Sequence, residues 1–154
     1  MPGKQQSMET QMSETYSGTP IMVRHDGGTR FIASVRDHEI VTDQMEHHGG
    51  ANSGPTPLEA LGAALGSCIA LYVQQFCETR GLPFEGMRVE VRQKNEKNPN
   101  RVGKFAVTLV MPEQIPEQYA AMLERVVQSC PVHNTLVEGA EMTVDILVPA
   151  GHST

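Results

Sequence analysis

Tryptophan is absent from this sequence, aromatic residues make up only 5% of it, and three cysteines occur in 154 residues. With so few aromatic side chains, the core has to be built from Leu, Val, Ile, Met and Ala. Three widely spaced cysteines are too few for the disulfide framework of a small secreted protein. They therefore indicate either buried packing or thiol redox chemistry.

The chain also lacks an excess of positive charge, a signal peptide and a long apolar run. Its formal net charge of −6 argues against nucleic acid as a partner, because phosphate binding needs clustered Lys and Arg. No apolar run is long enough to span a bilayer, and the polar first residues lack the hydrophobic stretch of a signal peptide. We therefore expect a cytoplasmic protein with no membrane partner.

The N-terminal part of the chain is expected to contain a loose extension and then strands. Residues 1–18 are polar and show no periodicity, which predicts a flexible extension before a single domain over residues 19–150. Extended runs separated by turn residues predict a meander of three strands. These runs cover residues 21–24, 30–35 and 38–42, and a loop without regular structure is expected at 46–54.

The strongest local signal is a capping box at Thr56-Pro57-Leu58-Glu59. Thr56 is a good N-cap, Pro57 suits the first helical position, and Glu59 follows the cap by three residues. The predicted helix continues to about Thr79. No charged residue occurs between Glu59 and Glu78, and a helix that is apolar nearly all round is expected to be buried.

The remaining segments predict an α+β protein. Alternating runs indicate a hairpin with one solvent-facing side, and a second helix is expected from Pro116. A short helical turn opens at Cys130, and a closing strand is expected near the C-terminus. The hairpin strands cover residues 87–92 and 104–110, and the closing strand covers 142–148. The α+β class follows from the order of these elements, which is strands, helix, strands, helix and strand.

Local physical chemistry predicts different environments for the three cysteines. Cys130 directly precedes Pro131 and a predicted helix start, where free backbone N–H groups favour a thiolate. Cys68 lies in the middle of the long helix and would need a nearby cation, for which Arg24 and Arg30 are the plausible sources. Cys77 is about 13 Å further along the helix axis, too far for a disulfide with Cys68, and is expected to be structural. Locally, Cys130 is therefore the more acidic thiol.

Two cysteine motifs stand on these predicted helices. The first combines Gly54-Pro55-Thr56-Pro57-Leu58-Glu59 with Ala64-Leu65-Gly66-Ser67-Cys68, and the second is Cys130-Pro131-Val132-His133-Asn134-Thr135-Leu136. Together, on these elements, they resemble the OsmC/Ohr family of osmotically inducible and organic hydroperoxide resistance proteins. The resemblance covers roughly residues 20–149 and is to the general OsmC-like branch.

The resemblance implies an intertwined homodimer in which antiparallel sheets wrap long central helices. It further implies a cysteine-based peroxidase that protects against oxidative stress, without a cofactor. Cys68 would attack the hydroperoxide and become a sulfenic acid, Cys130 would form a disulfide with it, and an external dithiol would reset the pair. The family's catalytic arginine would correspond to Arg24 or Arg30, which flank the first turn, with Arg36 in the next turn left open. This assignment of roles conflicts with the local ranking of the two thiols.

The sequence departs from the better-studied hydroperoxidases at one position. Those proteins have a glutamate directly after the helix-starting proline, where this chain has Leu58, and Glu59 follows one residue later. One residue rotates a side chain by about 100° around a helix. Glu59 is therefore a candidate catalytic residue that the capping box already explains.

Other functions have less support. Zinc usually needs three or four ligands, and the Cys130–His133 spacing and the His47-His48 pair supply no complete motif, so no metal is expected. No Gly-x-Ser-x-Gly elbow indicates a hydrolase. A non-catalytic binder or redox sensor that uses an apolar interface cleft is the main alternative. An apolar pocket is expected from Leu58, Leu61, Leu65, Tyr72 and Phe31.

Overall fold

The structure is a computed structural model that describes residue 16 and residues 18–149. The chain divides into two compact units, Met1–Ala60 and Leu61–Thr154, and each is described by itself. Most of the predicted N-terminal extension lies outside the described residues. The single domain over residues 19–150 stays a prediction.

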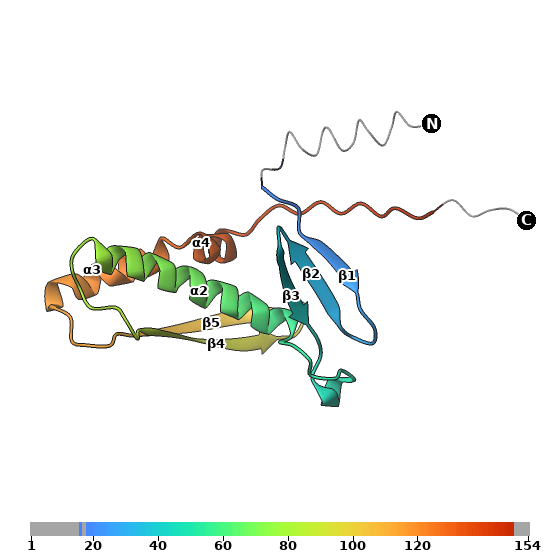
Figure 1. The fold of residues 1–154 in the computed structure, drawn as a ribbon, viewed down its shortest axis with the longest axis horizontal. Helices are drawn as coiled ribbons and strands as arrows, with labels where there is room; N and C mark the ends of the chain where they lie inside the picture. The colour runs from blue at the N-terminus through green and yellow to red at the C-terminus, as the bar shows by residue number, and fades with distance from the viewer. Residues whose placement is uncertain (1–15, 17, 150–154) are drawn as a thin grey trace, which may run out of the picture. The chain divides into compact units, whose positions relative to one another are not determined.

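The first unit contains the predicted meander. Three antiparallel strands follow in the order β1-β2-β3: Met22–His25, Phe31–Val35 and His38–Thr42 (Figure 1). Met22 pairs with Ser34, and Phe31 pairs with Thr42. Gly27 and Gly28 make the β1–β2 turn with φ values of 97° and 54°, a left-handed conformation that glycine adopts without steric strain. The sequence prediction for this region is confirmed.

A buried carboxylate organises the loop after β3. Asp43 is 2% exposed, and its two oxygens accept hydrogen bonds from the Thr29 hydroxyl (2.6 Å) and the Ser53 hydroxyl (2.7 Å). The backbone N–H groups of Gln44, Ala51 and Ser53 also donate to it, at 2.8–3.2 Å. Within this loop Glu46–His48 forms the 3₁₀ turn η1, so the segment is more regular than its sequence predicts. A buried charge is tolerated here because donors surround it.

The long helix α2, Pro57–Glu78, begins where the capping box predicts. The Thr56 backbone N–H donates to Glu59 Oε2 at 2.7 Å, and the Glu59 backbone N–H donates to Thr56 Oγ1 at 3.3 Å. Two of the N–H groups that a helix start leaves without partners are thereby satisfied. Both the start and the end of the helix are confirmed.

Only one stripe of α2 is buried, so the expectation of a helix buried all round is wrong. The stripe recurs at helical spacing and consists of Gly62, Leu65, Gly66, Ile69, Val73, Phe76 and Cys77. The opposite face, with Ser67 and Leu71, is exposed. The helix is also long and apolar enough to cross a membrane by length and composition, contrary to the expectation from the sequence. A core helix meets the same criterion, and this alone is weak evidence for a membrane.

In the second unit α2 packs against a two-stranded hairpin. β4, Arg88–Glu96, and β5, Arg101–Val110, are antiparallel and alternate between half-buried and exposed positions, which confirms the predicted hairpin. A Cβ atom at Gly66 would lie 3.1 Å from Val91 Cγ2, and one at Gly62 would lie 2.6 Å from Gln93 Nε2. The two glycines therefore let the helix approach β4 closely.

Two further helices complete the second unit. α3, Glu117–Gln128, starts after Pro116 as predicted, and Leu123 is buried in the same core as the α2 stripe. α4, Pro131–Glu138, has Cys130 as its N-cap and is longer than the short turn that the sequence indicates. Pro131 occupies the first turn, where the missing N–H of proline leaves no hydrogen bond unmade.

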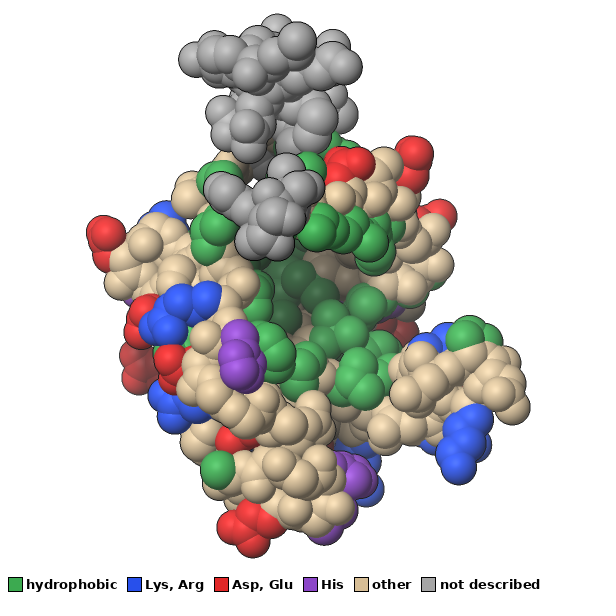
Figure 2. Space-filling view, turned by 90° about the vertical axis from the view of Figure 1, so that its right-hand side faces the viewer, with side chains coloured by type: hydrophobic (Ala, Val, Ile, Leu, Met, Phe, Trp, Pro, Cys, Tyr) green, Lys and Arg blue, Asp and Glu red, His purple; other side chains and the backbone are tan. Residues whose placement is uncertain are grey.

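The predicted closing strand at residues 142–148 is wrong for this structure, which has no strand there. Apolar side chains in this segment are instead 75–83% exposed: Met142, Val144, Ile146, Leu147 and Val148. A strand needs a neighbouring edge for its backbone hydrogen bonds, and alternating sequence alone does not supply one. Exposed apolar side chains also gather in the centre of the face drawn in Figure 2.

Candidate functional site

The structure brings Cys68 and Cys130 together in the second unit. Cys68 projects from the middle of α2, and Cys130 stands at the N-cap of α4. Cys130 is 0% exposed, Cys68 is half-buried against the same core, and the Cys68 thiol is a hydrogen-bond partner of Cys130. Both are free thiols. Two thiols in this relation can interconvert with a disulfide if one of them is first oxidised.

The helix start does not make Cys130 an acidic thiol, contrary to the local expectation. Burial raises the pKa of Cys130 above its ordinary value of 9.0, and the hydrogen bond with Cys68 raises it further. The backbone N–H groups of His133 and Val132 lower this pKa, as the helix start predicts, but burial outweighs them. The sequence shows that a helix begins here but does not show that the thiol is enclosed.

Cys77 is separate from this pair. It is 0% exposed in the core beneath α2, where burial raises the pKa of its thiol, while Arg80 acts in the opposite direction. The Arg80 guanidinium lies over the Phe76 ring at 3.9 Å from the ring centroid. Cys77 therefore occupies a packing position, as predicted for a structural cysteine.

The two candidate arginines lie in the first unit and share one carboxylate. Arg24 Nη1 is 2.8 Å from Asp26 Oδ1, and Arg30 Nε is 2.9 Å from Asp26 Oδ2. Arg24 Nη2 also lies 3.9 Å from Glu39 Oε1. The ion pairs hold both guanidinium groups at the β1–β2 turn, and their catalytic role stays a prediction.

Glu59 performs the structural role that the capping box predicts. Its carboxylate accepts the Thr56 N–H, so one oxygen is already engaged at the helix start. Leu58, at the position of the family's glutamate, is 39% exposed. A catalytic role for Glu59 therefore stays a prediction alongside its structural one.

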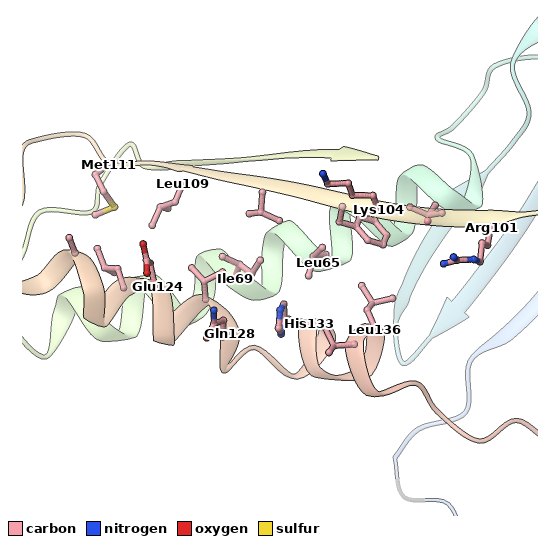
Figure 3. Close-up of a pocket in the computed structure, with 18 of the residues that line it drawn as sticks. Leu65, Ile69, Arg101, Lys104, Leu109, Met111, Glu124, Gln128, His133 and Leu136 are labelled. Atoms are coloured by element: carbon pink, nitrogen blue, oxygen red, sulfur yellow. The ribbon is translucent and has the colours of Figure 1, made fainter. Parts of the chain in front are cut away.

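A cavity of about 780 Å³ lies in the second unit, between β5, α3 and α4, with α2 forming its rear wall (Figure 3). Leu65 and Ile69 of α2 project into it, whereas Cys68 and Cys130 are not among its lining residues. Most other lining side chains are apolar, including Phe105, Val107 and Leu123. A cavity of this size and character can hold a small apolar molecule.

The lining of this cavity differs from the sequence expectation. Among the residues predicted to form an apolar pocket, Leu65 lines it, whereas Leu61 and Tyr72 do not. Leu58 and Phe31 belong to the first unit. The prediction placed the pocket on the face of α2 with the largest side chains, but the glycine-containing stripe faces the interior.

His133 is a cavity residue that the sequence did not identify. The sequence shows only its spacing from Cys130. In the structure it is half-buried, and its ring projects into the cavity (Figure 3). Its Nδ1 atom lies 3.3 Å from Asn134 Oδ1. Among residues 18–149, no group of three or more His, Cys, Asp or Glu side chains is arranged to hold a metal ion.

An α+β chain with two free thiols in contact is typical of a small thiol-dependent protein, and comparison with known proteins identifies the family. The sequence profile of the OsmC-like protein family matches residues 49–145, which is more than half of the chain. The chain belongs to the OsmC-like family. No curated protein sequence matches it at a significant level.

Solved structures share the fold at low sequence identity. A candidate osmotic stress induced and detoxification response protein from Psychrobacter arcticus matches with a TM-score of 0.72 and 20% identity, over 78% of this chain and 90% of that one. An OsmC-like protein from Mycoplasma pneumoniae matches with a TM-score of 0.67 and 18% identity, over 80% and 89%. An organic hydroperoxide resistance protein from Legionella pneumophila matches with a TM-score of 0.58 and 14% identity, over 79% and 91%. At these identities the likeness establishes the fold alone.

Proposed function

We propose that this protein reduces organic hydroperoxides with Cys68 as the attacking thiol and Cys130 as the resolving thiol. The single observation that carries the proposal is the direct contact of two free thiols from different helices. Cys68 is the more exposed of the two, so a substrate reaches it first. Membership in the OsmC-like family and the hydroperoxide resistance relatives support the same chemistry.

The reaction has three steps. The Cys68 thiolate attacks the outer oxygen of the hydroperoxide, the O–O bond breaks, and the alcohol leaves with a proton while Cys68 becomes a sulfenic acid. The Cys130 sulfur then attacks the Cys68 sulfur, and the disulfide forms as water leaves. An external dithiol reduces the disulfide by two exchange steps and restores both thiols.

A cation beside Cys68 would favour its thiolate, and Arg24 and Arg30 are the candidates. Each is ion-paired with Asp26, and a thiolate partner would have to share or replace that ion pair. Glu59 is the further candidate for holding such an arginine. The apolar walls of the cavity favour a substrate with a hydrocarbon group over hydrogen peroxide.

A homodimer and a cytoplasmic location belong to the same proposal. Apolar side chains exposed by 75–83% at the C-terminus are unusual for a surface that faces only water, and a second copy of the chain would cover them. The partly exposed face of α2 supports the same assembly. Sedimentation of the purified protein measures the oligomeric state directly.

The test is consumption of cumene hydroperoxide with a dithiol or a monothiol as reductant. Wild type is expected to turn over with the dithiol, Cys68→Ser to be inactive, and Cys77→Ser to retain activity as the matched control. Cys130→Ser is expected to lose most turnover with the dithiol, because no disulfide can form. Equal activity of wild type and Cys68→Ser would reject the proposal.

The volume and apolar lining of the cavity support a second candidate, a binder of small apolar molecules in which the cysteines do not turn over. Binding of a fluorescent apolar probe that is equal in wild type and Cys68→Ser, without peroxidase activity in either, would favour it.

A further inference from the structure

The starts of α2 and α4 both pair a polar N-cap residue with a polar residue at the third helical position, but the side chains differ. Thr56 and Glu59 are the N-cap and third helical residues of α2, and the backbone N–H of each donates to the other's side chain. Cys130 and His133 occupy the same two positions of α4, again with a proline directly after the cap. The His133 backbone N–H acts on the Cys130 sulfur just as the Glu59 N–H acts on the Thr56 hydroxyl. Side chains at these two positions share one face of the first turn.

The His133 ring can accept a proton. Its Nδ1 atom lies 3.3 Å from Asn134 Oδ1, and a neutral imidazole keeps one ring nitrogen with a free lone pair. The ring projects into the cavity (Figure 3). A histidine base that serves a cysteine thiol is a recurrent arrangement in cysteine chemistry.

Resolution by Cys130 needs such a base. Cys130 has no exposed surface, so water does not remove its proton. Burial and the Cys68 thiol both raise its pKa, so the thiol form predominates at neutral pH, and the thiol is a poor nucleophile.

We propose that His133 accepts the proton of Cys130 when Cys130 forms the disulfide with Cys68. The imidazole takes the thiol proton as the Cys130 sulfur bonds to the Cys68 sulfur. The Cys68 S–O bond of the sulfenic acid breaks, and the proton passes from the imidazolium to the departing hydroxide, which leaves as water. No further oxidant or reductant enters this step. The inference deepens the proposed function and rests on it for the sulfenic acid, but the proton transfer applies to any leaving group on Cys68.

The test uses a leaving group other than hydroxide. Reaction of the reduced protein with 4,4′-dithiodipyridine places a thiopyridyl group on Cys68 and releases one thiopyridone. Attack by Cys130 then releases a second thiopyridone in an intramolecular phase that absorbance follows. His133→Gln removes the base, and His38→Gln, an exposed histidine on β3, is the matched control. A parallel arm triggers the same step with cumene hydroperoxide.

We expect His133→Gln to slow the intramolecular phase about 100-fold, within the usual range for general-base catalysis. The first phase in His133→Gln, and both phases in His38→Gln, should stay at wild-type values. An intramolecular phase at the wild-type rate in His133→Gln would overturn the inference. If hydroperoxide does not oxidise the wild type but the thiopyridyl phase still depends on His133, the inference holds and the proposed function fails.

Discussion

The thiols of Cys68 and Cys130 are hydrogen-bonded to each other, one from the middle of α2 and the other from the N-cap of α4. The contact joins a half-buried thiol to a fully buried one. Oxidation of the more exposed partner therefore leaves the buried partner in position to close a disulfide. Most of the predicted chemistry of this protein follows from that pairing.

Thiol reactivity should show the effect of this contact on Cys130. Cys68→Ala removes one cause of the raised pKa, so the pH midpoint for alkylation of Cys130 should move down toward 9.0 without reaching it, since burial remains. Ser67→Ala, at an exposed neighbouring position, should leave the midpoint unchanged. Iodoacetamide labelling against pH, resolved by peptide mass spectrometry, measures both. An unchanged midpoint in Cys68→Ala would show that the contact does not affect the Cys130 thiol.

Variants of the capping box can distinguish a structural role of Glu59 from a catalytic one. Glutamine keeps an acceptor for the Thr56 N–H, so the free energy of unfolding of Glu59→Gln should lie within about 0.5 kcal/mol of the wild-type value. Thr56→Ala should lower it by about 1 kcal/mol. Urea unfolding gives these values. Peroxidase activity is measured on the same variants, and full activity in Glu59→Gln would leave Glu59 a structural role alone. Lost activity at wild-type stability would instead assign a catalytic role to the Glu59 carboxylate.

Asp43 should make the fold sensitive to acid. Hydrogen bonds from Thr29 and then Ser53 hold its pKa well below the ordinary range. Its contribution to stability is therefore complete above the unfolded value near 3.9 and is lost as the pH falls below it. Asp43→Asn places an amide N–H₂ among donors, so it should lower Tm strongly at pH 7 and somewhat less at pH 3, where the unfolded carboxyl is already largely protonated. Asp37→Asn, at an exposed turn, should change Tm little at either pH. An equal loss at both pH values would contradict this role.

The close approach of α2 to β4 depends on Gly66. Valine there would drive its side chain into Val91 and should reduce the free energy of unfolding by about 1–3 kcal/mol through overpacking. Gln75→Val, on the exposed face of the same helix, introduces the same side chain without that contact. Chemical denaturation of both variants tests the difference. Similar losses of the free energy of unfolding in the two variants would show that α2 can move away from β4 at little cost.

Much of the fold follows from local sequence. The capping box at Thr56 predicts where α2 starts, and the alternation in β4 and β5 predicts the hairpin, because each signal acts within a few residues. The buried stripe of α2 was predicted less well, because Gly62 and Gly66 face the sheet and carry no hydrophobic signal themselves. The expected strand at residues 142–148 has the right alternation. Pairing, however, also needs the free edge of a neighbouring strand, which the sequence of the segment itself does not report.

The site was predicted in part. The two cysteine motifs identify the pair through resemblance, while the lower acidity of Cys130 depends on burial, which no local pattern reports. Asp43 is missed because its donors come from Thr29 and from a loop that folds back on it. The one available signal for His133 was its spacing from Cys130, which matches the capping box at Thr56.

The most direct test of the central claim is a disulfide map after one equivalent of cumene hydroperoxide. Reduced protein is mixed with the peroxide, quenched with an alkylating reagent and digested for mass spectrometry. The account predicts a peptide pair linked through Cys68 and Cys130, with Cys77 recovered as an unoxidised thiol. Recovery of Cys68 and Cys130 as unoxidised thiols, or a disulfide that involves Cys77, would contradict it.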